Sequence, residues 1–147
     1  MDALDRRILA ELGTDARKPL TGVADALGVA PTTLHQRVKR LEERGVIVGS
    51  RLVIDWAAAG YPVVAVVSIE VGASSLEDVA QSIESIPEVQ NCFAITGEFD
   101  LLMVIRARSS DHLGEILERL RNVSPGRSRT GVVLRTFFEA RMPPLDA

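Results

Sequence analysis

The chain has 147 residues, of which 46% are hydrophobic and 25% charged, and its formal net charge is −3. This composition is typical of a folded globular protein of one ordinary domain or two small ones, and it excludes a wholly disordered chain. The longest apolar run, residues 63–67, is far too short to span a bilayer, and charged residues interrupt the N-terminus where a signal peptide needs an apolar core. We therefore expect neither a membrane segment nor a secretion signal.

Cysteine usage and charge distribution narrow the class further. The single cysteine, Cys92, cannot form an internal disulfide, and we interpret it as a small buried residue in a reducing cytoplasm. Residues 1–52 contain nine Lys or Arg and seven acidic residues, a balance of +2, whereas the remainder carries −5. Basic charge concentrated in one half is typical of a DNA-binding module joined to an acidic partner domain.

The N-terminal part predicts three helices. Residues 2–12 place leucine and isoleucine on one face, and residues 20–47 predict two further short helices joined by a tight turn. Gly28 ends the first of this pair in a left-handed cap, and Pro31 suits the first position of the second. Three helices of this length form the smallest unit that buries a helix-turn-helix.

The second helix of the pair has one apolar and one polar face. Leu34, Val38 and Leu41 recur at the spacing of a buried stripe. Hydroxyl, imidazole, amide and cationic groups then point outward, from Thr32, Thr33, His35, Gln36, Lys39 and Arg40. Such a face suits the DNA major groove, where small polar groups read base edges and cations hold phosphates. The alternative is an ordinary solvated surface.

Residues 46–54 predict a β-hairpin with its turn at Gly49-Ser50, which would make residues 1–55 a winged helix-turn-helix domain. Arg51 beside that turn either reaches a phosphate or is a plain surface residue. Residues 56–62 are the expected linker, a short turn containing the only tryptophan and the only tyrosine, which we expect to pack a domain junction or a subunit contact.

Residues 63–147 predict a second domain in which strands and helices alternate. The expected strands are 63–71, 89–96, 99–108 and 128–141, with a two-residue turn at Gly97-Glu98. One helix is expected to start with a serine cap at Ser74-Ser75, and the other is capped by Ser109 or Ser110. The order βαββαβ is the ferredoxin-like arrangement, with both helices on one face of the sheet, so the fold class is α+β. The other sheet face is too apolar for water, and we predict at least a dimer that covers it.

Three segments together resemble the Lrp/AsnC (feast/famine) family of transcriptional regulators. They are LDRRILAEL, LGVAPTTLHQRVKRLEERGVI and TGEFDLLMVI, in the family's order and at its separation. The resemblance implies a winged helix-turn-helix followed by a RAM (regulation of amino acid metabolism) domain. It also implies dimerisation through the sheet, assembly into tetramers or octamers, and binding of a small effector, usually an amino acid, with no other cofactor and no metal.

Site residues follow from the resemblance position by position. Arg37 matches the recognition-helix arginine and Lys39 and Arg40 a basic pair, all expected to contact phosphates. Bases would be read by Thr32, Thr33, His35 and Gln36. The effector would meet the turn Gly97, Glu98, Phe99 and Asp100, and the hydroxyls of Ser128 and Thr130. Asp100 either pairs with an effector's ammonium group or caps a nearby amide.

Two positions depart from the family pattern. Ala30 stands where a capping serine is usual, which costs roughly 1 kcal/mol of helix stability. Ser124-Pro125 replaces the Gly-Val that usually precedes the last strand, which alters the loop near the expected effector site.

The leading hypothesis is a sequence-specific DNA-binding regulator that senses a small effector. A small enzyme on the ferredoxin-like half is the second hypothesis, although that half shows no paired histidines, no metal-type Cys/His spacing and no glycine-rich phosphate loop. An architectural DNA-binding protein without an effector is the third.

Overall fold

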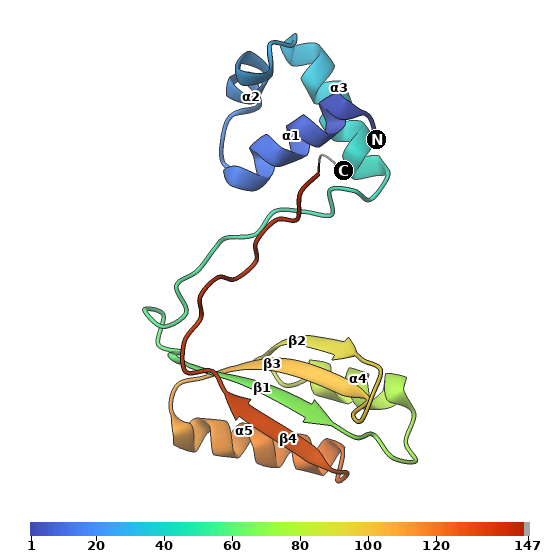
Figure 1. Ribbon diagram of the computed structural model, residues 1–147, viewed down its shortest axis with the longest axis vertical. Coiled ribbons are helices and arrows are strands. Elements are labelled where there is room, and N and C mark those ends of the chain that lie inside the picture. Colours follow the sequence, from blue (N-terminus) through green and yellow to red (C-terminus); the bar gives the residue numbers. More distant parts are fainter. Residues whose placement is uncertain (146–147) are drawn as a thin grey trace. The chain divides into compact units, whose positions relative to one another are not determined.

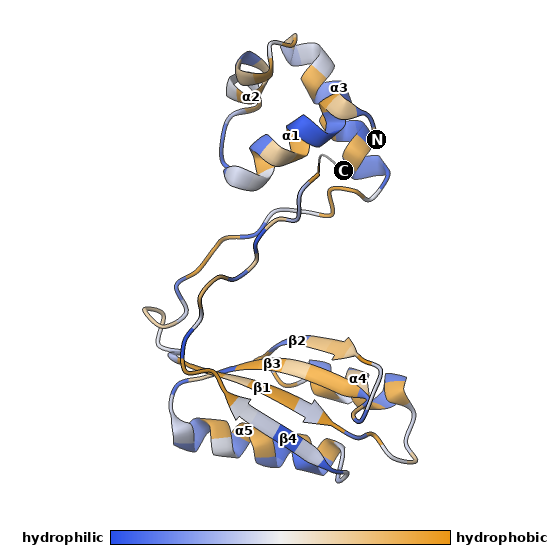
Figure 2. Ribbon diagram, viewed as in Figure 1, coloured by the Kyte–Doolittle hydropathy of each residue, from blue (hydrophilic) through white to orange (hydrophobic). Residues whose placement is uncertain are grey.

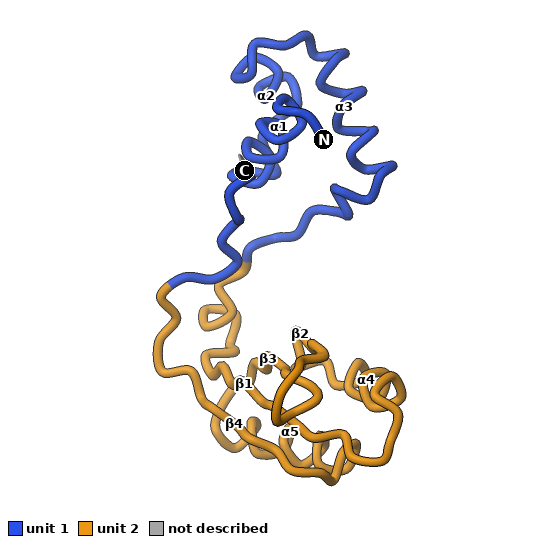
Figure 3. The backbone as a smooth tube through the Cα atoms, turned by 45° about the vertical axis from the view of Figure 1, so that its right-hand side comes forward, with its two compact units in different colours: residues 1–53, 138–147 blue, residues 54–137 orange. Residues whose placement is uncertain are grey.

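The computed structural model describes residues 1–145 and divides into two compact units (Figure 3). One comprises residues 1–53 with the C-terminal segment from residue 138, and the other residues 54–137. Residues 146 and 147, which the predicted second domain includes, lie outside the described residues. Among the described residues, none of the helices has the length and apolar character that crossing a membrane requires.

The first unit is a three-helix cluster of α1 (Ala3–Thr14), α2 (Leu20–Leu27) and α3 (Pro31–Glu43) (Figure 1). Its core contains one residue of α1, two of α2 and three of α3. They are Ile8, Val23, Ala24, Leu34, Val38 and Leu41. The three α3 residues are the stripe that the spacing predicts, so the orientation of α3 is confirmed.

The helix ends follow from local chemistry. At the start of α1 the Asp2 carboxylate accepts a hydrogen bond from the Asp5 N–H and the Asp5 carboxylate one from the Asp2 N–H, a capping box. Gly28 ends α2 with φ of 68°, the left-handed conformation predicted for it. Ala30 precedes Pro31 without a side-chain cap, as its methyl group dictates.

The predicted wing is wrong. The segment between α3 and residue 63 contains no strand, and Val48, Leu52 and Val53 are 92%, 77% and 102% exposed. A hairpin is stable only when its apolar side is covered, and no residue among the described 1–145 covers these side chains. The first domain is a helix-turn-helix without a wing.

The predicted linker does contain the expected short turn. The Asp55 carboxylate accepts a hydrogen bond from the Ala58 N–H at 3.0 Å, and the Tyr61 N–H donates to the Trp56 carbonyl at 2.7 Å. The rings of Trp56 and Tyr61 meet edge to face, with 6.4 Å between their centroids.

The second unit is a four-stranded antiparallel sheet with two helices. Its elements are β1 (Val63–Ile69), α4 (Leu76–Glu84), β2 (Val89–Ala94), β3 (Leu101–Ala107), α5 (Ser110–Val123) and β4 (Ser128–Val132). The strand order is β2-β3-β1-β4, the ferredoxin-like order (Figure 1). A serine caps each helix, as predicted, and of the candidate serines it is Ser75 and Ser109 whose hydroxyls do so.

One face of the sheet packs under α4 and α5, and alternate residues of β1 and β3 are buried there. The intervening residues form the open face. Its apolar members are Val64, Val66, Leu102 and Val104, only partly buried, and Phe93 of β2, which is exposed. Figure 2 shows that β2 and β3 consist largely of hydrophobic residues. The apolar open face expected from the sequence is therefore present.

Three details differ from the prediction. The last strand, predicted to reach residue 141, ends at Val132, and Leu134 and Phe137 beyond it are exposed. An edge strand continues only as far as the neighbouring strand, here β1, can pair with it. In place of the two-residue turn predicted at Gly97-Glu98 there is a longer loop, which is closed by a hydrogen bond from the Ile95 N–H to the Asp100 carbonyl. Cys92 is exposed, because β2 is an edge strand.

Candidate nucleic-acid interface and effector site

The polar face of α3 is open to solvent. Six of its predicted DNA contacts are exposed: Thr32, Thr33, His35, Gln36, Lys39 and Arg40. Nδ1 of His35 lies 3.1 Å from the Pro31 carbonyl, which leaves the other ring nitrogen facing outward. Arg51 is also exposed, but it lies in the strand-free connection and not beside a hairpin turn.

Arg37 lies differently from the other α3 cations. Its Nη1 forms ion pairs with the carboxylates of Asp2 and Asp5, the latter at 2.9 Å. Arg40 approaches the same Asp5 oxygen at 3.7 Å. The Asp5 side chain is only 2% exposed, so α1 offers α3 a buried carboxylate that binds one arginine and attracts a second.

The protonation equilibria of this cluster reflect the pairing. The Arg37 guanidinium and the Asp5 N–H lower the pKa of Asp2 to about 2. Burial by itself raises the pKa of Asp5, but hydrogen bonds from the Asp2 N–H and from Arg37 outweigh it and lower the pKa below its ordinary value. Both carboxylates are thus ionised at neutral pH, and they fix the Arg37 side chain against α1.

Sequence reasoning missed Asp2 and Asp5 as partners of Arg37. The spacing of the two aspartates at the start of α1 is a capping-box signal, but nothing in the sequence indicates that the same carboxylates face α3. The predicted phosphate contact of Arg37 stays a prediction. In the free protein that guanidinium is bound to carboxylates.

The predicted effector turn follows β2. Gly97 has φ of 122°, a conformation that L side chains rarely adopt, and Phe99 is buried although it lies in a loop. The Asp100 carboxylate accepts a hydrogen bond from the Val71 N–H at 2.8 Å, and the Asp100 N–H donates to the Ile69 carbonyl at 3.0 Å. Of the two interpretations of Asp100, the structure favours the amide cap.

Two arginines that sequence reasoning missed flank this turn. The Cζ atoms of Arg127 and Arg129 lie 5.5 and 5.3 Å from the centroid of the Phe99 ring. Glu98 bridges them, one carboxylate oxygen 3.1 Å from Arg127 and the other 3.5 Å from Arg129. The available signal was the spacing of the arginines by two residues, which puts both on one face of a strand.

The unusual loop before β4 holds Arg127 in place. The buried Ser124 hydroxyl donates to the Glu70 carbonyl at 3.0 Å, and the Glu70 N–H donates to the Arg127 carbonyl at 2.8 Å. Gly126 passes so close to the Glu70 carbonyl that a Cβ atom would collide with it. The departure at Ser124-Pro125 therefore fastens the loop to the end of β1.

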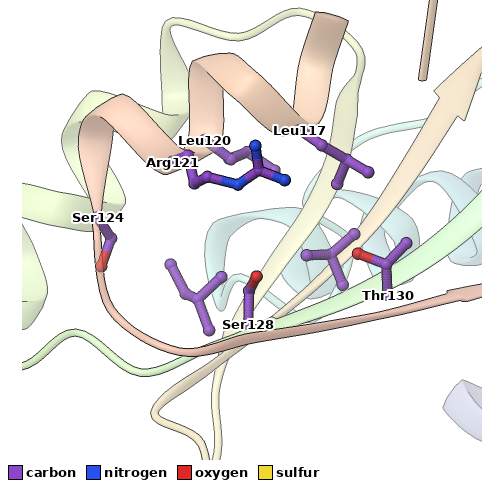
Figure 4. A pocket seen from close by; sticks show the side chains of 8 residues that line it. Leu117, Leu120, Arg121, Ser124, Ser128 and Thr130 are labelled. Atoms are coloured by element: carbon purple, nitrogen blue, oxygen red, sulfur yellow. The ribbon is translucent and has the colours of Figure 1, made fainter. Parts of the chain in front are cut away.

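Ser128 and Thr130 lie on the opposite side of β4, since they pair with the buried residues Ile69 and Val67. Together with Arg121 and Ser124 they line a pocket between α5 and the sheet (Figure 4). Its volume of about 30 Å³ suits a water molecule, not an amino acid. The structure thus divides the predicted effector residues between two sheet faces.

Known families account for most of the chain. Residues 1–42 match the AsnC-type helix-turn-helix domain, and residues 64–143 match the Lrp/AsnC ligand binding domain. The chain belongs to the Lrp/AsnC family of transcriptional regulators. The resemblance seen in the sequence is confirmed, and so is a helix-turn-helix domain followed by a ligand-binding domain.

Relatives cover nearly the full length. The HTH-type transcriptional regulator FL11 of Pyrococcus horikoshii is 31% identical over 147 residues, 99% of this chain and 97% of the relative. LrpA of Mycobacterium tuberculosis is 32% identical, and its crystal structure matches with a TM-score of 0.85 over 98% of this chain and 99% of that one. A feast or famine regulatory protein of M. tuberculosis, complexed with L-methionine, matches with a TM-score of 0.91 at 32% identity, over 97% and 98% of the two chains.

Proposed function

We propose that this transcriptional regulator binds operator DNA with the exposed face of α3, in the cytoplasm, as a dimer or larger assembly whose second domain senses an amino acid. The observation that carries the proposal is the division of α3. Leu34, Val38 and Leu41 fix it in a core, and its polar groups are left accessible to the major groove.

The DNA-binding part is tested by gel retardation with the DNA upstream of the protein's own gene. Gln36→Ala is expected to change preference at one base position, whereas Arg17→Ala, an exposed cation outside α3, should leave both preference and affinity unchanged. Wild-type protein that fails to retard any duplex at low ionic strength would overturn the proposal.

The dimer proposal depends on the open face of the sheet. Specific interfaces bury roughly 1,200–2,000 Å², and a continuous apolar sheet face is a surface that a second copy can cover. Val104→Lys places a charge on this face without entering the core under the helices. Sedimentation equilibrium should show the variant as a monomer. Its circular dichroism should show wild-type helix content. A variant that sediments like wild type would place the interface elsewhere.

Support for effector sensing comes from the family's ligand-binding domain and from the relative complexed with L-methionine. The test is calorimetric titration with a panel of amino acids, followed by gel retardation with any that bind. A protein that binds DNA but no amino acid would be an architectural DNA-binding protein instead.

A further inference from the structure

The turn after β2 brings two cations to one aromatic ring. The guanidinium groups of Arg127 and Arg129 both lie over the Phe99 ring, and Phe99 is only 8% exposed. Like charges repel, so such a pair persists only when a compensating group holds it. The Phe99 ring and the Glu98 carboxylate together supply that compensation.

The Glu98 carboxylate forms ion pairs with both arginines. Each of its oxygens is within 3.5 Å of a different arginine, and its side chain is 50% exposed. Gly97 precedes it at a φ of 122°, a backbone conformation that glycine adopts readily because it has no Cβ atom. Exposed ion pairs of this kind contribute little stability and exchange readily with other ions.

The backbones of both arginines are fixed by hydrogen bonds, and their side chains are 60% and 71% exposed. Arg127 follows a loop fastened to Glu70 by backbone and side-chain hydrogen bonds, and Arg129 lies within β4, paired with Ser68. Planar guanidinium groups match carboxylates in two-point recognition. The Asp100 carboxylate accepts a hydrogen bond from the Val71 N–H. A second acidic group, Glu70, lies beside the site, with its carboxylate 3.4 Å from Nε of Arg127.

We propose that Arg127 and Arg129 form a carboxylate-binding site that Glu98 fills in the absence of ligand, and that its ligands are acidic amino acids. The side-chain carboxylate of the ligand displaces Glu98 from the two arginines, and the released Glu98 carboxylate accepts the ligand's ammonium group. This inference rests on the proposed sensing of amino acids and specifies which class is sensed.

The experiment is calorimetric titration of the full-length protein with L-glutamate, L-glutamine and inorganic phosphate. We expect L-glutamate to bind at least tenfold more tightly than the isosteric L-glutamine or phosphate. Arg129→Gln should lower glutamate affinity at least tenfold. Glu98→Gln frees the arginine pair but removes the acceptor for an ammonium group, so it should raise the affinity for phosphate, which has no ammonium group. Arg135→Gln is the matched control, since Arg135 also stacks on a phenylalanine, Phe137, but away from the turn.

Each outcome has a distinct meaning. Equal affinity for glutamate and glutamine, or glutamate binding that survives Arg129→Gln, overturns this inference but leaves amino-acid sensing intact. Phosphate that binds as tightly as glutamate reduces the site to a general anion site and overturns the amino-acid assignment. If none of the amino acids in the wider panel binds, the inference and the proposed sensing fail together. Circular dichroism of each variant, expected to match wild type, verifies the fold.

Discussion

Two pairs of arginines in this protein lie beside carboxylates, in opposite surroundings. Arg37 and Arg40 of α3 approach Asp5, whose side chain is 2% exposed. Arg127 and Arg129 approach Glu98, whose side chain is 50% exposed. The ionic contacts are similar in length, yet one carboxylate is part of the helix packing and the other is in water.

Burial of the carboxylate, and not the presence of an ion pair, decides what the arginine does. A buried carboxylate without its partners pays a large desolvation penalty, so Asp5 binds Arg37 as a structural element. An exposed carboxylate is already solvated, and it can be replaced by a ligand's carboxylate at little cost. The first pair joins α1 to α3, whereas the second is available for recognition.

The largest effect is expected from removing the buried carboxylate. Asp5→Ala deletes the buried one of the two partners of Arg37, the acceptor for the Asp2 N–H and a neighbour of Arg40, so we expect a loss of about 2–3 kcal/mol in the free energy of unfolding. Urea denaturation followed by circular dichroism measures it. Glu98→Ala, the control from the other pair, should cost less than about 1 kcal/mol. Equal losses of unfolding free energy for Asp5→Ala and Glu98→Ala would show that burial of the carboxylate does not decide its structural role.

Acid should reproduce part of that loss without a mutation. The folded-state pKa of Asp2 is about 2 and that of Asp5 is lowered, against an ordinary value of 3.8. A lowered carboxyl pKa stabilises the folded state above pH 3.8, and this stabilisation disappears as the pH falls toward 2. The free energy of unfolding should therefore decline between pH 4 and pH 2, and the Asp2→Asn, Asp5→Asn double variant should decline less steeply. Parallel curves for the two proteins would contradict the pairing.

Local chemistry made most of the fold predictable. Gly28, Ser75 and Ser109 mark helix ends whose signals act within a few residues, and Leu34, Val38 and Leu41 show the buried stripe of α3 directly in their spacing. The wing at residues 46–54 was predicted from the same kind of local pattern and was wrong. A hairpin needs a covered face as well as a turn, and whether that face is covered is a property of the tertiary or quaternary structure.

The site was predictable only where exposure follows from helix periodicity. Gln36 and Lys39 were assigned to the outer face because their neighbours had to be inside. The partnership of Arg37 with Asp2 and Asp5 joins residues more than thirty positions apart, and the amide that Asp100 caps lies 29 positions away. Such pairs depend on how elements pack, which no spacing within one element encodes.

The cations of α3 also differ in exposure. Lys39 is 77% exposed, whereas Arg37 is 25% exposed and bound to carboxylates. If Lys39 contacts a phosphate, Lys39→Ala should weaken binding to all duplexes and reduce the slope of log affinity against log salt by about one. If Arg37 stays bound to Asp2 and Asp5 on DNA, Arg37→Ala should leave that slope unchanged while lowering stability. A slope reduced equally by both variants would show that Arg37 leaves Asp2 and Asp5 to reach the DNA.

The smallest effect concerns the ring between the exposed arginines. Phe99→Leu keeps an apolar side chain but removes the π face under Arg127 and Arg129, so the expected loss is about 0.5–1 kcal/mol in the free energy of unfolding. Phe137→Leu is the control, because Phe137 is 83% exposed and stacks with one arginine only. A loss at Phe99 as large as that of Asp5→Ala would mean that Arg127 and Arg129 are also structural. The proposal that these two arginines bind a ligand would then have to be abandoned, even though Glu98 is exposed.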